Sequence, residues 1–377
     1  MTIVKKTKWH SWCSGNLTEG CAMCVQGRKL VVFITGKCPQ RCFYCPVSED
    51  KFGKDDVYAN EWKILDPKNP LELLEEAKLT GATGAGITGG DPLANLGRTV
   101  EYIKILKKEF GKKFHIHLYT PMALSTKSNL KKLYDAGLDE IRFHPNLDND
   151  LLWKRIDNAN NFNWKVGVEI PCVPGYEEKT KKLIDFLEGK IKFINFNELE
   201  RSDTELAHYK LDEMGFKQRN DTTYGIAGSR ELGMKLIKYA YAKGIPAHFC
   251  TAKLKDLIQV GNRLKIRAKN IALPYDRITD EGLLLRGVIY IKGLEPGFDY
   301  KKRMKRRKSR KELELIKKVI QKEFKIKDIH IDEIRSRFIV PRETLKDKEK
   351  FRKLNLIPAF VEEYPTSDAF PIEIDFI

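Results

Sequence analysis

Three closely spaced cysteines are the residues of this sequence best suited to chemistry. Cys38, Cys42 and Cys45 lie in the segment GKCPQRCFYCP with the spacing C-x3-C-x2-C. A 4Fe-4S cluster takes four ligands, usually thiolates, so three cysteines would leave one iron open. An open position is typical of a catalytic metal site, because a substrate can occupy it. A structural zinc site is the alternative, although zinc usually takes four ligands, commonly from C-x2-C pairs.

A glycine-rich segment is the second feature. Thr88-Gly89-Gly90-Asp91-Pro92 ends a predicted strand, and glycines allow a backbone to approach a ligand closely. Gly84, Gly86 and Gly89 also fit G-x-G-x-x-G. In a dinucleotide fold this fingerprint joins a strand to a helix, whereas here it lies within a strand, which disfavours that interpretation.

The cysteine spacing, with Tyr44 just before the third cysteine, resembles the signature of radical S-adenosylmethionine (SAM) enzymes. The resemblance covers residues 29–250. It is closest to the activating enzymes of glycyl-radical proteins and to archaeal proteins related to pyruvate formate-lyase activating enzymes. It implies a 4Fe-4S cluster that binds SAM through the methionine amino and carboxylate groups and cleaves it reductively to a 5′-deoxyadenosyl radical.

The resemblance also implies a set of SAM contacts. Gly89-Gly90-Asp91 is similar to the family's Gly-Gly-Glu motif, which holds the methionine amino group, with Asp91 where glutamate is more common. Because the aspartate side chain is shorter than that of glutamate, we expect backbone contacts to SAM to matter more here than the Asp91 carboxylate. In related enzymes the ends of the later strands touch the ribose and adenine of SAM. The matching residues, for which ordinary strand-end polarity is the alternative, are Tyr119, Thr120, Glu169, Asn197 and Glu198.

A second group of cysteines precedes the first predicted strand of the core. Cys13, Cys21 and Cys24 have the spacing C-x7-C-x2-C, and Cys250 is the expected fourth ligand because a core that wraps round brings its two ends together. Four thiolates would hold a second 4Fe-4S cluster or a structural zinc. Buried unliganded thiols at Cys13 and Cys250 are one alternative, and His10 or His248 as ligands are another.

Cys172 lies at the end of a predicted strand. Inside a barrel it would be a catalytic candidate, as a hydrogen-atom donor or the carrier of a covalent intermediate. Packing in the core is the alternative for a buried free cysteine.

Short β-branched runs alternate with longer amphipathic stretches from Lys29 onward, which is typical of strand-helix units around a parallel sheet. Six such units predict an α/β fold, a partial (β/α)6 barrel of the radical SAM type, with its sites at the carboxyl ends of the strands. Helices are expected at 70–81, 98–110 and 127–138, the last closed by Gly137. The predicted strands are 29–36, 84–89, 114–120, 140–145, 165–172 and 193–199.

The pattern changes after Cys250 to a small, basic α+β domain. A helix is expected at 253–270 and another at 311–324, with strands at 283–293, 330–340 and 371–377. The predicted organisation is therefore a cysteine-rich metal-binding segment, a partial barrel and a basic domain, at residues 1–28, 29–250 and 251–377.

Composition describes an ordinary globular protein, with 42% hydrophobic residues among 377. The sequence contains no run of 18 apolar residues and no secretory signal, so we expect a cytoplasmic protein with no membrane partner. Six of the eight cysteines lie within the first 45 residues, which favours metal ligation over disulfides. A charged fraction of 32% is also compatible with a hyperthermophile, where intracellular disulfides occur.

The formal charge of +17 is concentrated in the last third of the chain. Residues 251–377 hold 31 Lys and Arg against 20 Asp and Glu, a balance of +11, and eight of the ten residues 301–310 are basic. Such a surface can neutralise phosphates without reading sequence, so RNA, above all tRNA, is the expected partner. A solvated, self-repelling loop is the alternative.

Three functional hypotheses follow. The first is an RNA-modifying radical SAM enzyme, acting on a tRNA nucleoside and reduced by an electron donor such as ferredoxin or flavodoxin. The second keeps the chemistry but acts on a glycyl-radical protein, another peptide or a small cofactor precursor. The third is a non-catalytic nucleic-acid-binding protein whose metals are structural.

Overall fold

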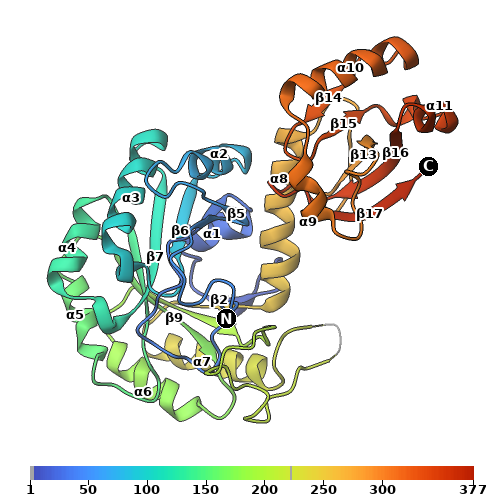
Figure 1. Ribbon diagram of the computed structural model, residues 1–377. Coiled ribbons are helices and arrows are strands. Elements are labelled where there is room, and N and C mark those ends of the chain that lie inside the picture. The colour runs from blue at the N-terminus through green and yellow to red at the C-terminus, as the bar shows by residue number, and fades with distance from the viewer. Residues whose placement is uncertain (1–3, 221–222) are drawn as a thin grey trace. The chain divides into compact units, whose positions relative to one another are not determined.

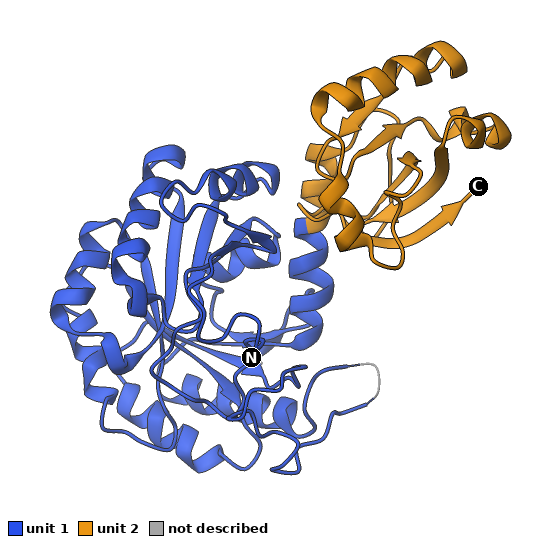
Figure 2. Cartoon of the chain, in the orientation of Figure 1, with its two compact units in different colours: residues 1–263 blue, residues 264–377 orange. Residues whose placement is uncertain are grey.

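A computed structural model describes residues 4–220 and 223–377. The chain divides into two compact units, Met1–Arg263 (unit 1) and Leu264–Ile377 (unit 2), which have different colours in Figure 2. The division into a cysteine-rich segment, a partial barrel and a basic domain, at residues 1–28, 29–250 and 251–377, stays a prediction. Within the described residues, no helix is both long and apolar enough to cross a membrane.

Unit 1 is the partial barrel that the sequence predicts. The barrel strands from β3 to β11 pair in parallel and in chain order, except for β4 and β5, and helices pack against their outer face, as Figure 1 shows. The main crossover helices are α2 (Leu71–Leu79), α3 (Leu96–Phe110), α4 (Lys127–Asp135), α6 (Glu177–Leu187) and α7 (Ser229–Ala242), with a short α5 (Ile156–Ala159). The six predicted strands are present as β3 (Lys29–Phe33), β6 (Gly84–Thr88), β7 (His115–Pro121), β8 (Glu140–His144), β9 (Lys165–Cys172) and β10 (Phe193–Glu198).

The sheet continues past the predicted units at both edges. A seventh parallel strand, β11 (Ala247–Cys250), pairs with β10, and the N-terminal strands β2 (Trp12–Ser14) and β1 (Lys5–Lys6) follow in antiparallel orientation. At the other edge, β4 (Tyr58–Ala59) and β5 (Trp62–Lys63) extend the sheet beyond β3. These strands have two to four residues, too few for an alternating apolar pattern to be visible in the sequence.

The two faces of the barrel strands differ in polarity because side chains alternate along a strand. Residues such as Val32, Ile87 and Phe143 face the helices and belong to the main hydrophobic core. The inner face carries buried polar side chains instead, among them Lys29, His117, Arg142, Glu169 and Asn195. The interior of the barrel is therefore built to bind polar groups rather than to pack as a core.

Unit 2 is an α+β unit with a five-strand antiparallel order β14-β15-β13-β16-β17 and a short β12 beside β13. Helix α10 (Arg310–Phe324) begins with a capping box formed by Ser309 and Glu312, and its apolar face packs on the sheet. The other elements assigned to this part of the chain are α8 (Gly261–Ile271), β12 (Arg277–Ile278), β13 (Leu284–Ile291), α9 (Tyr300–Arg303), β14 (His330–Asp332), β15 (Arg337–Val340), α11 (Lys348–Lys353), β16 (Leu356–Glu363) and β17 (Pro371–Phe376). A π-helix, η4 (Leu254–Val260), precedes α8 where the sequence predicts one continuous helix.

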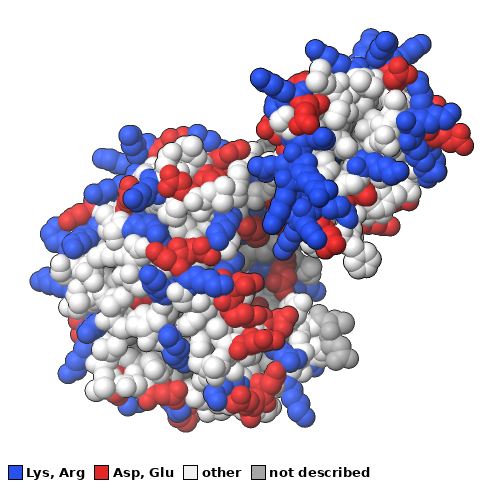
Figure 3. Space-filling model, in the orientation of Figure 1, with Lys and Arg blue, Asp and Glu red and all other residues white. Residues whose placement is uncertain are grey.

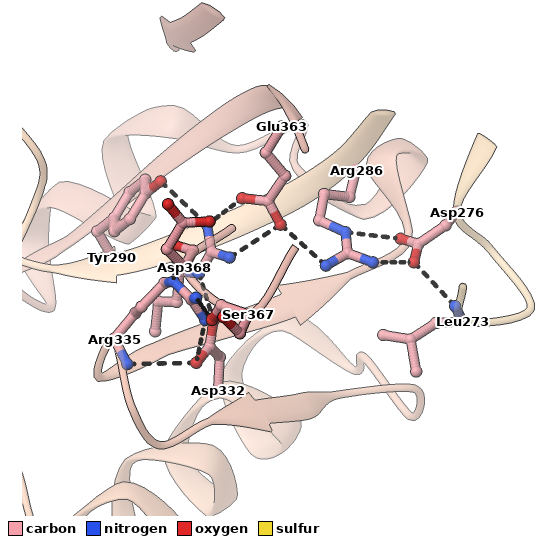
Figure 4. Close-up of polar contacts among 10 residues, drawn as sticks. Leu273, Asp276, Arg286, Tyr290, Asp332, Arg335, Glu363, Ser367 and Asp368 are labelled. Carbon is pink, nitrogen blue, oxygen red and sulfur yellow. Dashed lines mark hydrogen bonds and ion pairs between the residues drawn. The ribbon is translucent and has the colours of Figure 1, made fainter. Parts of the chain in front are cut away.

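A buried ion network crosses the sheet of unit 2, as Figure 4 shows. The Glu363 carboxylate is fully buried and accepts hydrogen bonds of 2.8 and 2.9 Å from Arg337 and one of 2.9 Å from Arg286. Arg286 also pairs with Asp276, and Arg337 with Asp332. Because each buried charge has a partner of opposite sign, the network holds the strands in register without an uncompensated charge.

Candidate functional site

The cysteine loop opens directly after β3 and contributes to one cavity. Residues 37–48 contain no helix or strand, and Cys38, Cys42 and Cys45 all line a cavity of about 560 Å³ at the carboxyl ends of the barrel strands. All three cysteines are free. The structure therefore brings the three predicted cluster ligands together where the sequence places the site.

The electrostatics of the three thiols fit a cationic cluster. Burial raises the pKa of Cys42 to about 12, and the nearby Cys45 and Cys38 add to the rise. Burial likewise raises the pKa of Cys38 to about 11. The thiolates therefore need a positive group beside them, which the irons of a 4Fe-4S cluster provide.

The spacing of potential ligands also bears on the kind of metal group. In a cubane cluster each cysteine sulfur binds a different iron, so three cysteines on one short loop would leave one iron without a protein ligand. Cys38, Cys42 and Cys45 fit such a cluster, because all three line the same cavity.

The glycine segment packs tightly against the base of the cysteine loop. Gly89 has a φ of +148°, and a Cβ atom on Gly90 would lie 2.6 Å from the Lys37 carbonyl oxygen and 2.7 Å from that of Gly36. Any side chain at position 90 would therefore push the cysteine loop away. Gly89 and Gly90 both line the cavity, as the predicted SAM contacts require.

Asp91 departs from the predicted contact. Its side chain is fully buried and does not line the cavity, because Oδ1 accepts hydrogen bonds from the Leu93 amide (3.0 Å) and the Thr120 hydroxyl (2.8 Å). Oδ2 has no hydrogen-bond partner among the described residues, and burial raises the pKa of Asp91 to about 6. Asp91 instead caps the 3-10 helix η1 (Pro92–Asn95) and positions Thr120, which does line the cavity.

Glu169 is a carboxylate of the cavity wall that is ionised at neutral pH. Its carboxylate accepts hydrogen bonds from Arg142 (2.8 Å), Asn195 (2.9 Å) and Asn197 (3.1 Å). Burial alone would raise the pKa of Glu169, but Arg142, Asn195 and Asn197 lower it to about 2. A carboxylate fixed in this way at the cavity suits hydroxyl donors such as those of a ribose.

Tyr44 has a partner that the sequence analysis missed. Its hydroxyl lies 3.0 Å from His144 Nε2, and His144 Nδ1 donates to the Glu169 carbonyl oxygen at 2.9 Å. Burial lowers the pKa of His144, so the neutral imidazole accepts a hydrogen bond from the Tyr44 hydroxyl at Nε2. His144 ends β8 and lines the cavity. Its position as a polar residue at the end of a predicted strand is the sequence feature that marks it as a candidate.

Besides Asp91, the predicted residues Glu198 and Cys172 also lie outside the cavity lining. Glu198 follows Asn197 in β10 and points to the other face, where it pairs with Arg219 (2.7 Å) and accepts from the Ala252 amide (3.0 Å). Cys172 is fully buried in the main core with Val168 and Ile170, on the face of β9 opposite Glu169. Alternation along a strand explains both corrections, since neighbouring residues face opposite sides. Packing therefore accounts for Cys172.

The glycines of the G-x-G-x-x-G pattern have a different role from nucleotide binding. A Cβ atom on Gly84 would lie 2.4 Å from the His115 carbonyl oxygen, and one on Gly86 would lie 2.9 Å from His117 Nε2. Both glycines leave room for polar groups inside the barrel, and neither lines the cavity.

Other residues of the cavity were absent from the sequence prediction. Phe33, Gln40 and Lys51 line it beside the cysteine loop. They lie on or near the loop but form no spacing that marks them in the sequence. The predicted residues Tyr119, Thr120, Glu169 and Asn197 line it from the strand ends.

Comparisons with known proteins identify the family of this chain. The profile of the Radical SAM superfamily matches residues 32–167. A protein of Methanocaldococcus jannaschii, provisionally named a glycyl-radical enzyme activating enzyme, is 40% identical over 95% of this chain and 92% of its own length. GTP 3′,8-cyclase of Staphylococcus aureus (strain bovine RF122 / ET3-1) is 31% identical over 35% of this chain and 38% of its own.

Among solved structures, methylornithine synthase aligns with a TM-score of 0.37 and 15% identity over 60% of this chain and 74% of that one. The cysteine signature, the cavity at the strand ends and the relative that matches nearly the whole chain agree with one another. This chain belongs to the radical SAM superfamily and is an enzyme that uses a 4Fe-4S cluster and SAM.

Proposed function

We propose that this enzyme cleaves SAM in the cavity of unit 1 and passes the resulting radical to a glycine residue of a partner protein. The main support for this proposal is that Cys38, Cys42 and Cys45 line the same cavity as Gly89, Gly90 and the polar residues at the strand ends. The name of the Methanocaldococcus jannaschii relative supports the choice of a protein glycine as substrate. Family membership removes the hypothesis of a non-catalytic nucleic-acid-binding protein.

Different residues of the cavity would bind the cluster and the two ends of SAM. When bound, the cluster supplies one electron that breaks SAM into methionine and a 5′-deoxyadenosyl radical, which takes a hydrogen atom from the substrate. Cys38, Cys42 and Cys45 would hold three irons of the cluster and leave one open for the methionine end of SAM. Gly89 and Gly90 would present backbone groups to the same end, and Glu169 would accept hydrogen bonds from the ribose hydroxyls.

The surroundings of Glu169 keep this arrangement rigid. Arg142, with a side chain 2% exposed, donates to Glu169 and also to Glu140 (2.6 Å) and the Tyr119 hydroxyl (3.2 Å). These bonds fix the carboxylate before SAM binds, so little ordering remains to be done on binding.

The test is an anaerobic, dithionite-driven assay for 5′-deoxyadenosine, run with a glycyl-radical enzyme of the same organism and read by electron paramagnetic resonance (EPR). We expect 5′-deoxyadenosine and a glycyl radical on the partner from the wild type, and neither from Cys38→Ala/Cys42→Ala/Cys45→Ala. SAM cleavage without a glycyl radical on any such partner would refute the protein substrate but not the SAM site.

RNA is a second candidate substrate, favoured by one surface of unit 2. Lys and Arg side chains gather on this unit, as Figure 3 shows. Lys301, Lys302, Lys305, Arg306 and Arg307 are exposed, and no described acidic side chain pairs with them. Phe298, just before this run, is 97% exposed, and an aromatic ring beside cations can stack on an unpaired base.

The salt dependence of tRNA binding tests this candidate. If all five cations contact phosphates, the affinity falls about 500-fold between 50 and 200 mM salt, because log K changes by about −0.9 per contact and unit of log salt. Replacing these five cations with alanine should abolish both tRNA binding and its salt dependence. Alanine at the exposed Lys318 and Lys322 of α10 should leave both unchanged. Unchanged tRNA binding in the fivefold variant would refute the RNA proposal.

A reducing compartment and a small electron donor complete the proposal. All eight cysteines are free, and free thiols persist in the cytoplasm. We therefore place the reaction there, with ferredoxin or flavodoxin as the donor.

A further inference from the structure

The second cysteine group lies against the inner face of the barrel, away from the loop that lines the SAM cavity. Helix α1 (Glu19–Val25) packs there, because a Cβ atom on Gly20 would lie 2.5 Å from His117 Nδ1 and 2.8 Å from Arg142 Nη2. Cys21 and Cys24 are three residues apart on this helix, so both lie on one face of it. Cys21 is buried there, beside Arg142 and Asn195 on the inner face of the barrel.

Cys250 joins this face from the end of β11. It is buried with Val25 of α1 and Leu254 of η4 in one small apolar cluster. Helix α1 also packs against η4, which begins four residues after Cys250. Cys250 therefore lies beside the helix that carries Cys21 and Cys24, although 226 or more residues separate it from them in the sequence.

Cys13 reaches the same place through the strand register. In the antiparallel pair β2 and β11, Cys13 lies opposite His248, so Cys13, His248 and Cys250 share one face of the sheet. The His248 side chain is itself buried, and its Nε2 lies 3.1 Å from the Ser11 hydroxyl. Cys13 therefore faces the same side of the sheet as Cys250.

Donors around the sulfurs match the needs of bound thiolates. Asn195 Nδ2 and Arg142 Nη2 lie 3.3 and 3.6 Å from the Cys21 sulfur, and Gln259 Nε2 lies 3.8 Å from that of Cys250. Gln259 belongs to the π-helix η4, and π-helical turns are frequent at functional sites. Hydrogen bonds to the sulfurs are among the features that set the potential of a cluster.

We propose that Cys13, Cys21, Cys24 and Cys250 hold a second iron–sulfur cluster on the inner face of the barrel. The strand register makes Cys13 and Cys250 diagonal neighbours on the pair β2 and β11. The donors beside the Cys21 and Cys250 sulfurs are of the kind that stabilises the thiolates of a bound cluster.

Arg142 separates this cluster from the SAM cavity. Its guanidinium donates to Cys21 on one side and to Glu169 and Tyr119, which line the cavity, on the other. The second cluster therefore lies one side-chain layer from the first site. The inference does not depend on the substrate of the enzyme.

Metal analysis of the full chain, purified and reconstituted without oxygen, tests the proposal. We expect about eight irons per wild-type chain and about four in Cys38→Ala/Cys42→Ala/Cys45→Ala, since each cubane holds four. The reduced triple variant should then show an EPR signal of one 4Fe-4S cluster. Cys21→Ala/Cys24→Ala should also keep about four irons and lose that signal when combined with the triple variant.

Two controls keep the result decisive. Cys172→Ser changes a buried cysteine outside both groups and should keep about eight irons. Cys13→Ser changes a half-exposed strand position, so it should fold even if the double variant does not, and it should alter the EPR signal of the second cluster. A triple variant that folds but holds one zinc, or no metal, would overturn the proposal.

Discussion

Replacing Glu169 with glutamine tests the electrostatics of the SAM cavity most directly. The change keeps the size and one oxygen of the side chain but removes its charge. In the wild type this carboxylate accepts from Arg142, Asn195 and Asn197. The variant leaves the buried Arg142 with Glu140 as its remaining carboxylate partner.

The expected loss of stability follows from the pKa. The pKa of Glu169 falls from 4.5 to about 2 in the folded chain, because Arg142 and the two asparagines outweigh the effect of burial. At about 1.36 kcal/mol per unit, this difference stabilises the folded state by about 3 kcal/mol at neutral pH. For a domain of this size, a loss of about 3 kcal/mol lowers the Tm by about 6–12 °C.

The pH dependence has a definite sign. Because the pKa is lower in the folded state, the stabilisation is fully present above pH 4.5 and is lost as the pH falls towards 2. The Tm difference between wild type and Glu169→Gln should therefore be constant from about pH 6 to 8 and shrink below about pH 4.5.

Thermal unfolding followed by circular dichroism measures this Tm difference. The relevant transition is the one that shifts when SAM is added, because it reports on unit 1. SAM affinity is a second readout, since the loss of one hydrogen bond to a charged group costs about 1.5–3 kcal/mol, or about 10- to 150-fold in Kd. Glu177→Gln is the matched control, because Glu177 pairs with Lys181 and Lys235 at the surface, where ion pairs add little. Equal Tm values at pH 7, or a difference that grows on acidification, would refute the reasoning.

Three further predictions concern the glycine segment, unit 2 and the core. Gly90→Ala should displace the cysteine loop, because its Cβ would lie 2.6 Å from the Lys37 carbonyl oxygen, and should abolish iron binding at Cys38, Cys42 and Cys45 and the formation of 5′-deoxyadenosine. Gly97→Ala has nothing within 4 Å of its Cβ and should keep iron binding and activity. Equal activity of the two variants would contradict the packing argument. Glu363→Ala should destabilise unit 2 by about 3–5 kcal/mol, because Arg286 and Arg337 lose a buried carboxylate partner. Limited proteolysis should then show new cleavage within residues 264–377. Glu373→Ala changes an exposed residue and should cause no new cleavage. Cys172→Ala should lower the Tm but leave 5′-deoxyadenosine formation unchanged, because the thiol packs in the core; loss of SAM cleavage in a folded variant would return Cys172 to the reaction.

Local patterns in the sequence determined most of the barrel. The six strands and the helices between them follow from apolar periodicities of two and 3.6 residues, which depend on neighbours along the chain. The cysteine loop and Gly89-Gly90 could be found for the same reason, since their spacing within a few residues carries the chemistry. The short strand β11, with four residues, fell below the length at which periodicity can be read.

Only the tertiary structure decided which strand-end residues face the cavity. Asn197 lines it and Glu198 does not, although they are neighbours, because the face that a residue takes depends on where the strand enters the sheet. Likewise Asp91 turns to Thr120, 29 residues away, and Tyr44 meets His144, 100 residues away.

The second cysteine group shows the same division. Its spacing marked Cys13, Cys21 and Cys24 as ligands, but the surroundings of these sulfurs come from pairing between the two ends of unit 1. Cys13 lies opposite His248 only because β2 pairs with β11, and Cys21 meets Asn195 only because α1 packs inside the barrel. Contacts between segments more than 150 residues apart, such as Cys21 and Asn195, leave no trace in a local pattern, so packing alone assembled this environment.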